Sequence, residues 1–448
     1  MRKKKGPVKE AGQAKEVSNP FKLMLKNAEE RFGARTYTGE EGKQLITGVE
    51  LPSLSLMYLF DSNVVPFSKM IGIAGPPQCQ KSSLAYDFSR MVMGCHGGGA
   101  LHFETEGEKY SPTLAESIVG MEAFNDRFCT LQCTELTEAQ KLMTEMLKQY
   151  KDTAKHGEPV VMIVDSLSGA DAGEMYDKIK KDGYAGRDYS ISALSWTRYL
   201  RVFCADLVGF PVVFLTVNHL KTTPPAQPFM PPIENTPGGK AQWFHSAIYL
   251  YVHRTQSEQR LTRDVDGEAI SCATEIRTLK LTCKKTSIGK SDGRYINVDF
   301  IFYCDTVDGV KRQVSLFDWD ASTAYLLQWL QCDKSKGAVK SDLRDICDVS
   351  VVRNRFTSKK LGVENLSPSA FGKAVHADKN IMVGLLDFLN ITEHKIYDGA
   401  MPTPMRLLAP KEVYSNPMDA PVAPPVEAFQ KPDPDLLDDD IEIPDDDI

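Results

Sequence analysis

Residues 75–83, GPPQCQKSS, have residue types and a spacing that could bind phosphate. Phosphate-binding loops follow the pattern G-x-x-x-x-G-K-[ST]. In this pattern backbone N–H groups cradle the phosphate oxygens, the lysine neutralises the terminal phosphates and the hydroxyl reaches Mg²⁺. Gly75, Lys81 and Ser82 match the pattern, but Gln80 stands where the second glycine is expected. The stretch therefore predicts a nucleotide site with one irregular position.

Acidic residues follow two other apolar runs. Asp165 ends the run VVMIV at 160–164, and a carboxylate at such a strand end can hold Mg²⁺ through water beside a phosphate loop. The run HFETEGEKYSP (102–112) carries several acids, one of which could take a proton from an attacking water. The residue types alone leave Glu104, Glu106 and Glu108 as candidates, with a plain acidic surface turn as the alternative.

A polar pair ends a further apolar run, PVVFLTVN (211–218). Asn218 and His219 stand at its tip, where they could sense the terminal phosphate of a nucleotide and pass its state to the loop that follows. A histidine that merely caps a strand is an equally good interpretation.

These side chains need a scaffold that brings them to one edge. From about Leu54 to Asp320, short β-rich runs alternate with helical stretches such as 82–94, 135–153 and 188–208, which is typical of a parallel sheet covered by helices. The run 160–164 is apolar throughout, which favours a central strand buried on both faces. We therefore predict an α/β fold with strands at 70–75, 99–105, 127–133, 159–166, 211–218, 246–254, 276–285 and 296–304.

Four regions are predicted along the chain. They are a basic arm with a short amphipathic helix at 19–32 (residues 1–50), the core (51–320), a helical mixed-charge region with a basic patch at 351–360 (321–400), and a Pro-rich linker with an acidic tail (401–448). Residues 220–239 contain six prolines and a Gly-Gly, so we predict no regular structure there. A loop of this length inside an α/β core favours a functional role.

Composition narrows the class of protein. The formal net charge of −7 hides an acidic tail, because residues 433–448 contain eight Asp and one Glu and the remainder is slightly basic. Such a tail can be a solvated, disordered end, and it can also compete with nucleic acid for a basic surface. We expect a soluble protein with no membrane partner, since no apolar run is long enough to span a bilayer. Ten irregularly spaced cysteines favour reduced thiols.

In chain order, these elements resemble the RecA family of homologous-recombination ATPases over about residues 40–320. The resemblance is carried by the phosphate loop, LHFETEGEKYSP, VVMIVDS, VNH and TPGGKAQWFHSAIYLYVHR. Within the family, the chain is similar to the bacteriophage UvsX-type branch, which also has a bulky residue at the second glycine of the loop, Asn-His at the sensor strand and an acidic C-terminal tail. Gln80 is then a mark of that branch.

The resemblance implies a RecA-like ATPase core with an N-terminal oligomerisation helix, a small C-terminal domain and a disordered acidic tail. ATP and Mg²⁺ are the implied cofactors. The implied catalytic residues are Glu106, as the base that activates water, Lys81 and His219, and the implied magnesium ligands are Ser82 and Asp165. Nucleotide contacts are implied for Gly75, Pro76, Pro77, Gln78, Cys79, Gln80, Lys81, Ser82 and Ser83, and for Lys284 and Lys285, one of which would reach a neighbouring subunit's ATP.

The resemblance also places single-stranded DNA along two loops, at about 168–190 and 220–242. The implied contacts are Lys178, Lys180, Lys181, Arg187, Lys221, Phe229, Met230, Gly238, Gly239 and Lys240. For Phe229 and Met230, anchoring of the loop against the core is an equal alternative to wedging between bases. Filament contacts between subunits are implied for Phe21, Leu25 and Phe244.

The implied activity is that of an ATP-dependent recombinase, which forms helical filaments on single-stranded DNA and exchanges strands with duplex DNA. Single-strand-binding and mediator proteins would be partners, in the cytoplasm of an infected bacterial host. Two alternatives stay open at this point, a replicative ring helicase of the same superfamily and a DNA-binding paralogue that has lost hydrolysis. The region after residue 320 would handle the incoming duplex or a mediator, or present only a solvated helical face.

Overall fold

The structure is a computed structural model that describes most of the chain between residues 46 and 397. The described ranges are 46–96, 98–107, 109–153, 158–169, 189–223, 233–237, 240–263, 269–290, 293–307, 310–332 and 340–397, together with Met24. Two compact units, Met1–Ile46 and Thr47–Ile448, divide the chain. Within the predicted helix at 19–32 only Met24 is described, and it is helical and 68% exposed.

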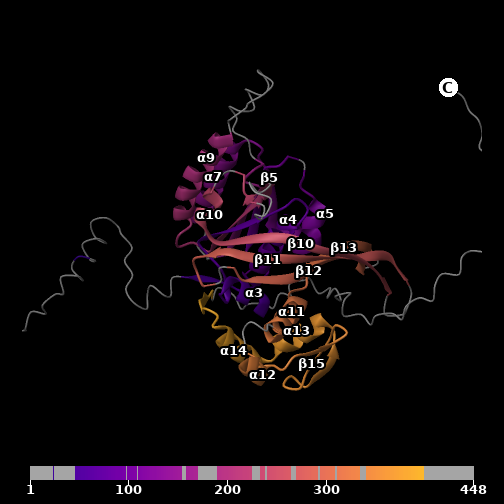
Figure 1. The fold of residues 1–448 in the computed structure, drawn as a ribbon. Helices are drawn as coiled ribbons and strands as arrows, with labels where there is room; N and C mark the ends of the chain where they lie inside the picture. The colour runs from indigo at the N-terminus through magenta and orange to yellow at the C-terminus, as the bar shows by residue number, and fades with distance from the viewer. Residues whose placement is uncertain are drawn as a thin grey trace, which may run out of the picture. The chain divides into compact units, whose positions relative to one another are not determined.

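A nine-stranded sheet forms the centre of the second unit (Figure 1). The strand order is β13-β12-β11-β10-β3-β7-β6-β4-β5, in which β10 to β5 pair in parallel and β10 to β13 pair antiparallel. The strands are β3 (Lys69–Gly75), β4 (Gly99–Glu104), β5 (Phe128–Gln132), β6 (Val160–Asp165), β7 (Val212–His219), β10 (Ser246–Arg263), β11 (Ala269–Thr286), β12 (Tyr295–Val307) and β13 (Val310–Phe317). The predicted α/β class with a mostly parallel sheet is confirmed.

Helices cover both faces of the parallel strands. They are α4 (Lys81–His96), α5 (Pro112–Val119), α6 (Met121–Arg127), α7 (Leu136–Thr153) and α9 (Tyr189–Asp206). Adjacent strand residues point to opposite faces. In β4, Phe103 joins the core of α7 and α9, while the ring of His102 lies 5.4 Å from that of Tyr86 in α4. Residues 161–164 are at most 1% exposed, which confirms the predicted central strand.

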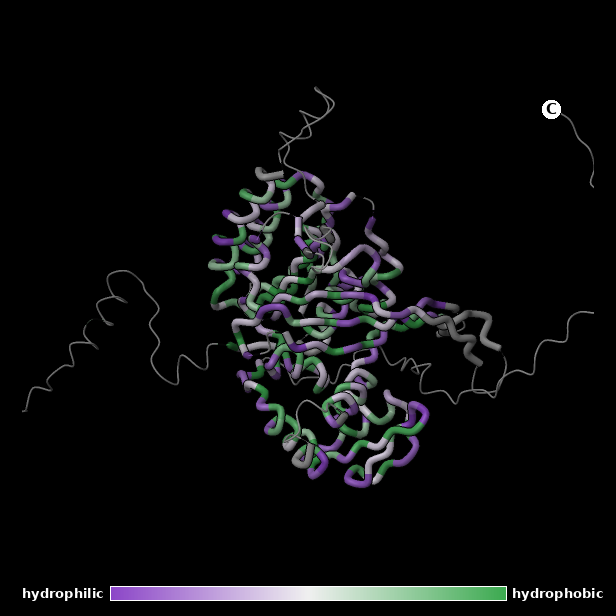
Figure 2. The backbone as a smooth tube through the Cα atoms, in the orientation of Figure 1, coloured by the Kyte–Doolittle hydropathy of each residue, from purple (hydrophilic) through white to green (hydrophobic). Residues whose placement is uncertain are grey.

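The covering helices form because their apolar residues recur at helical spacing. The outer helices accordingly alternate between hydrophobic and hydrophilic residues along the chain (Figure 2). In α9, Trp196 is 1% exposed and its Nε1 donates to the Leu167 carbonyl at 2.9 Å, which ties the helix to the end of β6. The buried residues of α7 are Leu136, Ala139, Met143 and Leu147.

The antiparallel part of the sheet is larger than the sequence predicts. Strands β10 and β11 have 18 residues each, about twice the length of the predicted runs 246–254 and 276–285. Strand β13 was not predicted at all, because Lys311, Arg312 and Gln313 interrupt its apolar pattern. It pairs with β12 over its whole length, with Val314 and Phe317 each 4% exposed. Backbone pairing and these apolar anchors hold a strand that the residue types mark only weakly.

The prediction that residues 220–239 lack regular structure is wrong at 221–223 and 233–235, while residues 224–232, 238 and 239 lie outside the described residues. Strands β8 (Lys221–Thr223) and β9 (Ile233–Asn235) pair antiparallel, and the short helix α10 (Ala241–His245) follows. The prolines at 224, 225, 228, 231, 232 and 237 all lie outside the paired residues. Since proline disrupts a ladder only where it sits within it, the flanking residues are able to pair.

The predicted region 321–400 is only partly helical, which corrects the sequence-based prediction. The basic patch at 351–360 lies on a β-hairpin, because Arg353 and Asn354 adopt the left-handed conformation of a tight turn, with φ of 51° and 60°. Alternating Val, Phe and Thr then favour strands. The elements are α11 (Trp319–Cys332), α12 (Lys340–Ile346), β14 (Ser350–Val352), β15 (Arg355–Ser358), β16 (Val363–Leu366), α13 (Pro368–Ala377), α14 (Lys379–Leu389) and β17 (Lys395–Ile396).

Strand β17 returns to the start of the second unit. It pairs in parallel with β1 (Thr47–Glu50), which pairs antiparallel with β2 (Val64–Pro66). Residues 47–50, which the sequence assigns to the N-terminal arm, are thus a strand of the second unit. The buried helix α3 (Leu54–Phe60), capped by the Ser53 hydroxyl, follows β1.

A buried histidine joins α3, α11 and α13. His376 Nδ1 lies 2.8 Å from Asp320 Oδ1, and His376 Nε2 accepts from the Leu54 backbone N–H at 3.1 Å. Nε2 accepts a hydrogen bond from the Leu54 N–H, so a proton on Nε2 would point at another hydrogen-bond donor. This geometry favours the neutral imidazole, and burial lowers the pKa of His376 to about 4.

Protonation of His376 predicts a loss of stability in acid. The unfolded histidine titrates near 6.5, so the unfolded chain takes up this proton first and the stabilisation falls as the pH drops from 6.5 to about 4. We expect the difference to approach about 3 kcal/mol. Denaturant unfolding of wild type and His376→Gln between pH 7 and pH 4.5 should show a flatter pH dependence in the variant, and equal slopes would contradict this assignment.

Candidate functional site

The ends of four neighbouring strands bring the predicted polar residues together. Strands β3, β7, β6 and β4 are adjacent and parallel, so their carboxyl ends share one edge of the sheet. Gly75 at the end of β3 pairs with His219, and Glu104 at the end of β4 pairs with Asp165. The loop that begins at Gly75 and the predicted acids therefore lie around the same edge.

The loop between β3 and α4 wraps around the Lys81 side chain. Lys81 is 6% exposed, and its Nζ donates to the Pro76 carbonyl at 2.8 Å. Gly75 has no room for a side chain, because a Cβ there would lie 2.4 Å from the Val252 carbonyl oxygen and 2.5 Å from Cys79 Sγ. The thiol of Cys79, 2% exposed, also donates to the Pro76 carbonyl, at 2.9 Å. The loop thus has a fixed shape before any ligand binds.

Gln80 occupies the backbone conformation that a glycine would normally supply. Its φ is 63°, in the left-handed region, and Gln78 has a similar φ of 59°. Two hydrogen bonds stabilise Gln80 there. Its side-chain Oε1 accepts from the Ser83 hydroxyl at 2.7 Å, and its carbonyl accepts from Leu84 N–H at 3.0 Å as α4 begins. The missing glycine therefore leaves the turn intact.

Asp165 lies beside the start of α4. Its carboxylate hydrogen-bonds with Ser82. The pKa of Asp165 is raised to about 6, mainly by burial and also by the Glu106 charge, against the lowering effects of Ser82 and Lys81. A hydroxyl and a carboxylate are the oxygen donors that Mg²⁺ prefers. The described part of the chain holds no cluster of three or more His, Cys, Asp or Glu ligands, so water and phosphate would complete the coordination.

Glu106 is the most heavily hydrogen-bonded acid at this edge. Its Oε1 accepts from the Ser166 hydroxyl at 2.6 Å and lies 2.7 Å from His219 Nε2, and its Oε2 accepts from Lys109 Nζ at 3.0 Å. The His219 hydrogen bond is the main reason that the pKa of Glu106 lies well below its usual range. Glu106 is thus held as a carboxylate.

The three candidate acids differ in position. Glu106 is 13% exposed at its side chain and faces His219, whereas Glu104 is 3% exposed and faces the turn that follows β4. Glu108 lies outside the described residues. The geometry favours Glu106, because it is the described acid of this run that contacts His219.

Asn218 links the site to the segment after β9. Its Nδ2 donates to the Pro237 carbonyl at 3.0 Å, and its Oδ1 accepts from the His219 N–H at 2.9 Å. The next residue, Leu220, donates its N–H to the Gly75 carbonyl at 2.9 Å. The tip of β7 therefore contacts both the loop around Lys81 and the predicted second DNA-binding loop.

The two adjacent lysines of β11 have different surroundings. Lys285 Nζ donates to the carbonyls of Trp243 and Phe244, at 2.6 and 2.9 Å, at the end of α10. Lys284 is exposed, and its Nζ lies 4.9 Å from the ring centre of Tyr251. Lys284 is the more exposed of the two, which makes it the better placed for a neighbouring molecule.

The remaining predicted residues are only partly described. Lys221 in β8, Lys240 before α10 and Phe244 in α10 are exposed, and Phe244 reaches 67%. Those outside the described residues are Phe21, Leu25, Lys178, Lys180, Lys181, Arg187, Phe229, Met230, Gly238 and Gly239.

Sequence reasoning missed three residues around Glu106. Ser166 and Lys109 donate to its carboxylate, and Gly169 leaves it room, since a Cβ at Gly169 would lie 2.8 Å from Glu106 Cγ. Ser166 follows Asp165 directly and could have been noticed as a hydroxyl at a strand end. Lys109 and Gly169 carry no such signal, because their role depends on where the turns place them.

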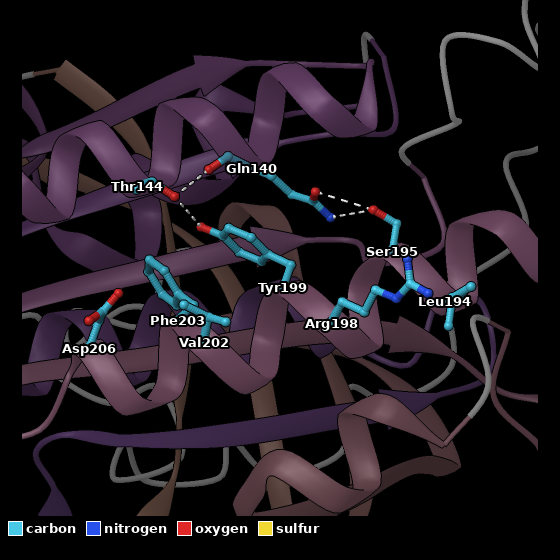
Figure 3. A pocket seen from close by; sticks show the side chains of 9 residues that line it. All are labelled: Gln140, Thr144, Leu194, Ser195, Arg198, Tyr199, Val202, Phe203 and Asp206. Carbon is cyan, nitrogen blue, oxygen red and sulfur yellow. Dashed lines mark hydrogen bonds between the residues drawn. The ribbon is translucent and has the colours of Figure 1, made fainter.

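A surface pocket of about 510 Å³ lies away from this edge, between α7 and α9 (Figure 3). Two hydrogen-bonded pairs join the helices there, Gln140 with Ser195 and Thr144 with Tyr199. Its rim includes the exposed Leu194 and Val202, 50% and 63% exposed. It does not include the residues around Lys81, so it is separate from the candidate site.

Comparison with protein-family models and with curated proteins gave no match. The candidate site therefore depends on geometry and on the sequence motifs alone. None of the described helices combines the length and apolar character that a bilayer crossing requires.

Substitutions at Gln80 test the left-handed turn. Gln80→Gly relieves the backbone and loses the Ser83 hydrogen bond, so the free energy of unfolding should stay within about 1 kcal/mol of wild type. Gln80→Val places a β-branched residue at positive φ and should cost about 1–3 kcal/mol. Urea unfolding of the three proteins measures both, and equal effects of Gly and Val would contradict the turn geometry.

Proposed function

We propose that this chain is an ATP-dependent DNA recombinase of the RecA type, which forms filaments on single-stranded DNA. The observation that carries the proposal is the meeting of Lys81, Asp165 and the Glu106–His219 pair at one edge of the sheet. These are the groups that phosphoryl transfer to water requires, a cation, a metal ligand and a base.

The loop around Lys81 would bind the phosphates of ATP. In the described contacts the ammonium group of Lys81 bonds only to the Pro76 carbonyl, and it would turn to the β- and γ-phosphates. The backbone N–H groups at the start of α4 would donate to the same phosphates. Ser82 and Asp165 fit Mg²⁺ by their donor chemistry. The metal would supply charge neutralisation of the phosphates.

Glu106 would orient and deprotonate the attacking water. Ser166 and His219 fix the carboxylate through Oε1, which leaves Oε2 and its exposed Lys109 partner toward solvent. A carboxylate held by several donors is a weak base, so loss of the His219 hydrogen bond would strengthen it. His219 would exchange its bond to Glu106 for one to the terminal phosphate when ATP binds.

The tip of β7 would connect hydrolysis with DNA. Asn218 contacts the segment after β9 through Pro237, and the exposed Lys221 and Lys240 flank this segment. Contacts from such lysines to the phosphates of single-stranded DNA would be independent of base sequence. Exposed Phe244 and Lys284 provide the surface for a neighbouring subunit.

An ATPase assay with single-stranded DNA tests the activity. DNA should stimulate phosphate release, Lys81→Ala should abolish it, and Glu106→Gln should lower kcat by about 10²–10³ while nucleotide still binds. Glu122→Gln, an exposed acid of α6, is the matched control and should behave as wild type.

Negative-stain microscopy should show filaments on DNA with ATP. DNA binding without any hydrolysis would indicate a non-hydrolysing paralogue, and closed rings with duplex unwinding would indicate a helicase.

His219→Ala tests the connection between site and loop. Because the imidazole contacts Glu106 from the tip of β7, its loss should leave ATP affinity within about threefold and reduce the stimulation of hydrolysis by DNA. Glu122→Gln, the exposed acid of α6, again serves as the control. Titration of hydrolysis rate against DNA measures the stimulation. A variant with the full wild-type stimulation would rule out this role.

A further inference from the structure

Glu104 is a buried carboxylate that the proposed reaction leaves without a role. It ends β4, pairs in register with Asp165, and is 3% exposed. By strand alternation its side chain points to the same face as His102, toward α4. The negative charges of Asp165 and Glu104 both raise the pKa of Tyr86 on that helix. Glu104 thus lies next to the candidate site, on the face of the sheet that α4 covers.

The carboxylate of Glu104 holds the turn that presents Glu106. Its Oε1 accepts the backbone N–H of Glu106 at 2.8 Å. Gly107 has a φ of 64°, so the chain reverses immediately after Glu106. Different partners therefore hold the two parts of Glu106, Glu104 its backbone and Ser166 and His219 its carboxylate.

This arrangement has an energetic cost. The second oxygen, Oε2, is buried and has no hydrogen-bond partner among the described residues. Burial of a carboxylate oxygen without a hydrogen-bond partner destabilises the folded state. Burial and the nearby Glu106 charge both raise the pKa of Glu104. The hydrogen bond to the Glu106 N–H is the described contact that offsets this cost.

We propose that Glu104 is a positioning residue for Glu106, setting the backbone turn from which Glu106 reaches Ser166 and His219. The inference deepens the proposed function and depends on it for the reaction. Glu104 does not itself act as the base, because its Oε1 accepts the Glu106 N–H and the residue is only 3% exposed to solvent. Displacement of a reacting group by about 1 Å can cost about a hundredfold in rate.

Two substitutions separate positioning from charge. Glu104→Gln keeps an oxygen that can accept the Glu106 N–H, whereas Glu104→Ala removes the acceptor. We expect Glu104→Ala to lower kcat for ATP hydrolysis by about ten- to a hundredfold with KM for ATP unchanged. Glu104→Gln should restore kcat to within about threefold of wild type, because the turn is retained.

A second measurement does not depend on hydrolysis. In protein labelled with ¹⁵N-histidine, the His219 ring nitrogen signal, assigned by its loss in His219→Ala, reports the bond to Glu106. It should move toward the free imidazole position in Glu104→Ala and stay in place in Glu104→Gln.

The outcomes are distinguishable. Wild-type kcat in Glu104→Ala, a parallel loss of kcat and ATP affinity, or equal impairment in both variants would overturn the positioning role. If wild type fails to hydrolyse ATP, the proposed function fails, and the His219 signal alone then decides the inference. An unmoved signal in Glu104→Ala overturns it.

Discussion

The parallel hydrogen bonding of β3, β7, β6 and β4 is the constraint on which the site depends. Parallel strands require a helical crossover between them, so every strand ends at the same edge and is followed there by a loop. The register places Gly75 opposite His219 and Glu104 opposite Asp165. A slip of one residue in β4 or β6 would turn these acids to the other face of the sheet, away from the loop around Lys81. Core packing of the buried strands therefore also sets the chemistry.

Two acids, Asp165 and Glu106, lie at this edge of the sheet, and their different surroundings give them different pKa values. Burial raises the pKa of Asp165 to about 6, while donors from His219, Ser166 and Lys109 hold the pKa of Glu106 well below its usual range. Two carboxylates in one site with different proton affinities can take different tasks. Lys81, which is buried, adds a positive charge beside them. This balance lets several ionised groups share a small space without unfolding the edge.

The sequence predicts the parallel core well because its information there is local. Apolar runs such as 160–164 mark buried strands, and polar residues at their ends mark the edge. It predicts less where pairing depends on distant partners, as for β13, the β8–β9 hairpin and the hairpin at Arg353 and Asn354. In the site, the strand-end residues could be named in advance. The roles of Ser166 and Lys109 could not be named in advance, because turn geometry decides them. The different surroundings of Lys284 and Lys285 could not be named either, because a β-bulge between Tyr249 and Leu250 decides them.

The hydrogen bond from Asn218 to Pro237 has a thermodynamic consequence. It joins the strand tip to the segment after β9, so a ligand that shifts one of them changes the energy of a bond that the other also makes. Such a connection acts equally in both directions. If a ligand at the site raises the affinity of the segment for its own ligand by some factor, then a ligand at the segment raises the affinity of the site by the same factor. Under the proposed function, single-stranded DNA would thus tighten the grip on ATP by the same ratio by which ATP tightens the grip on DNA.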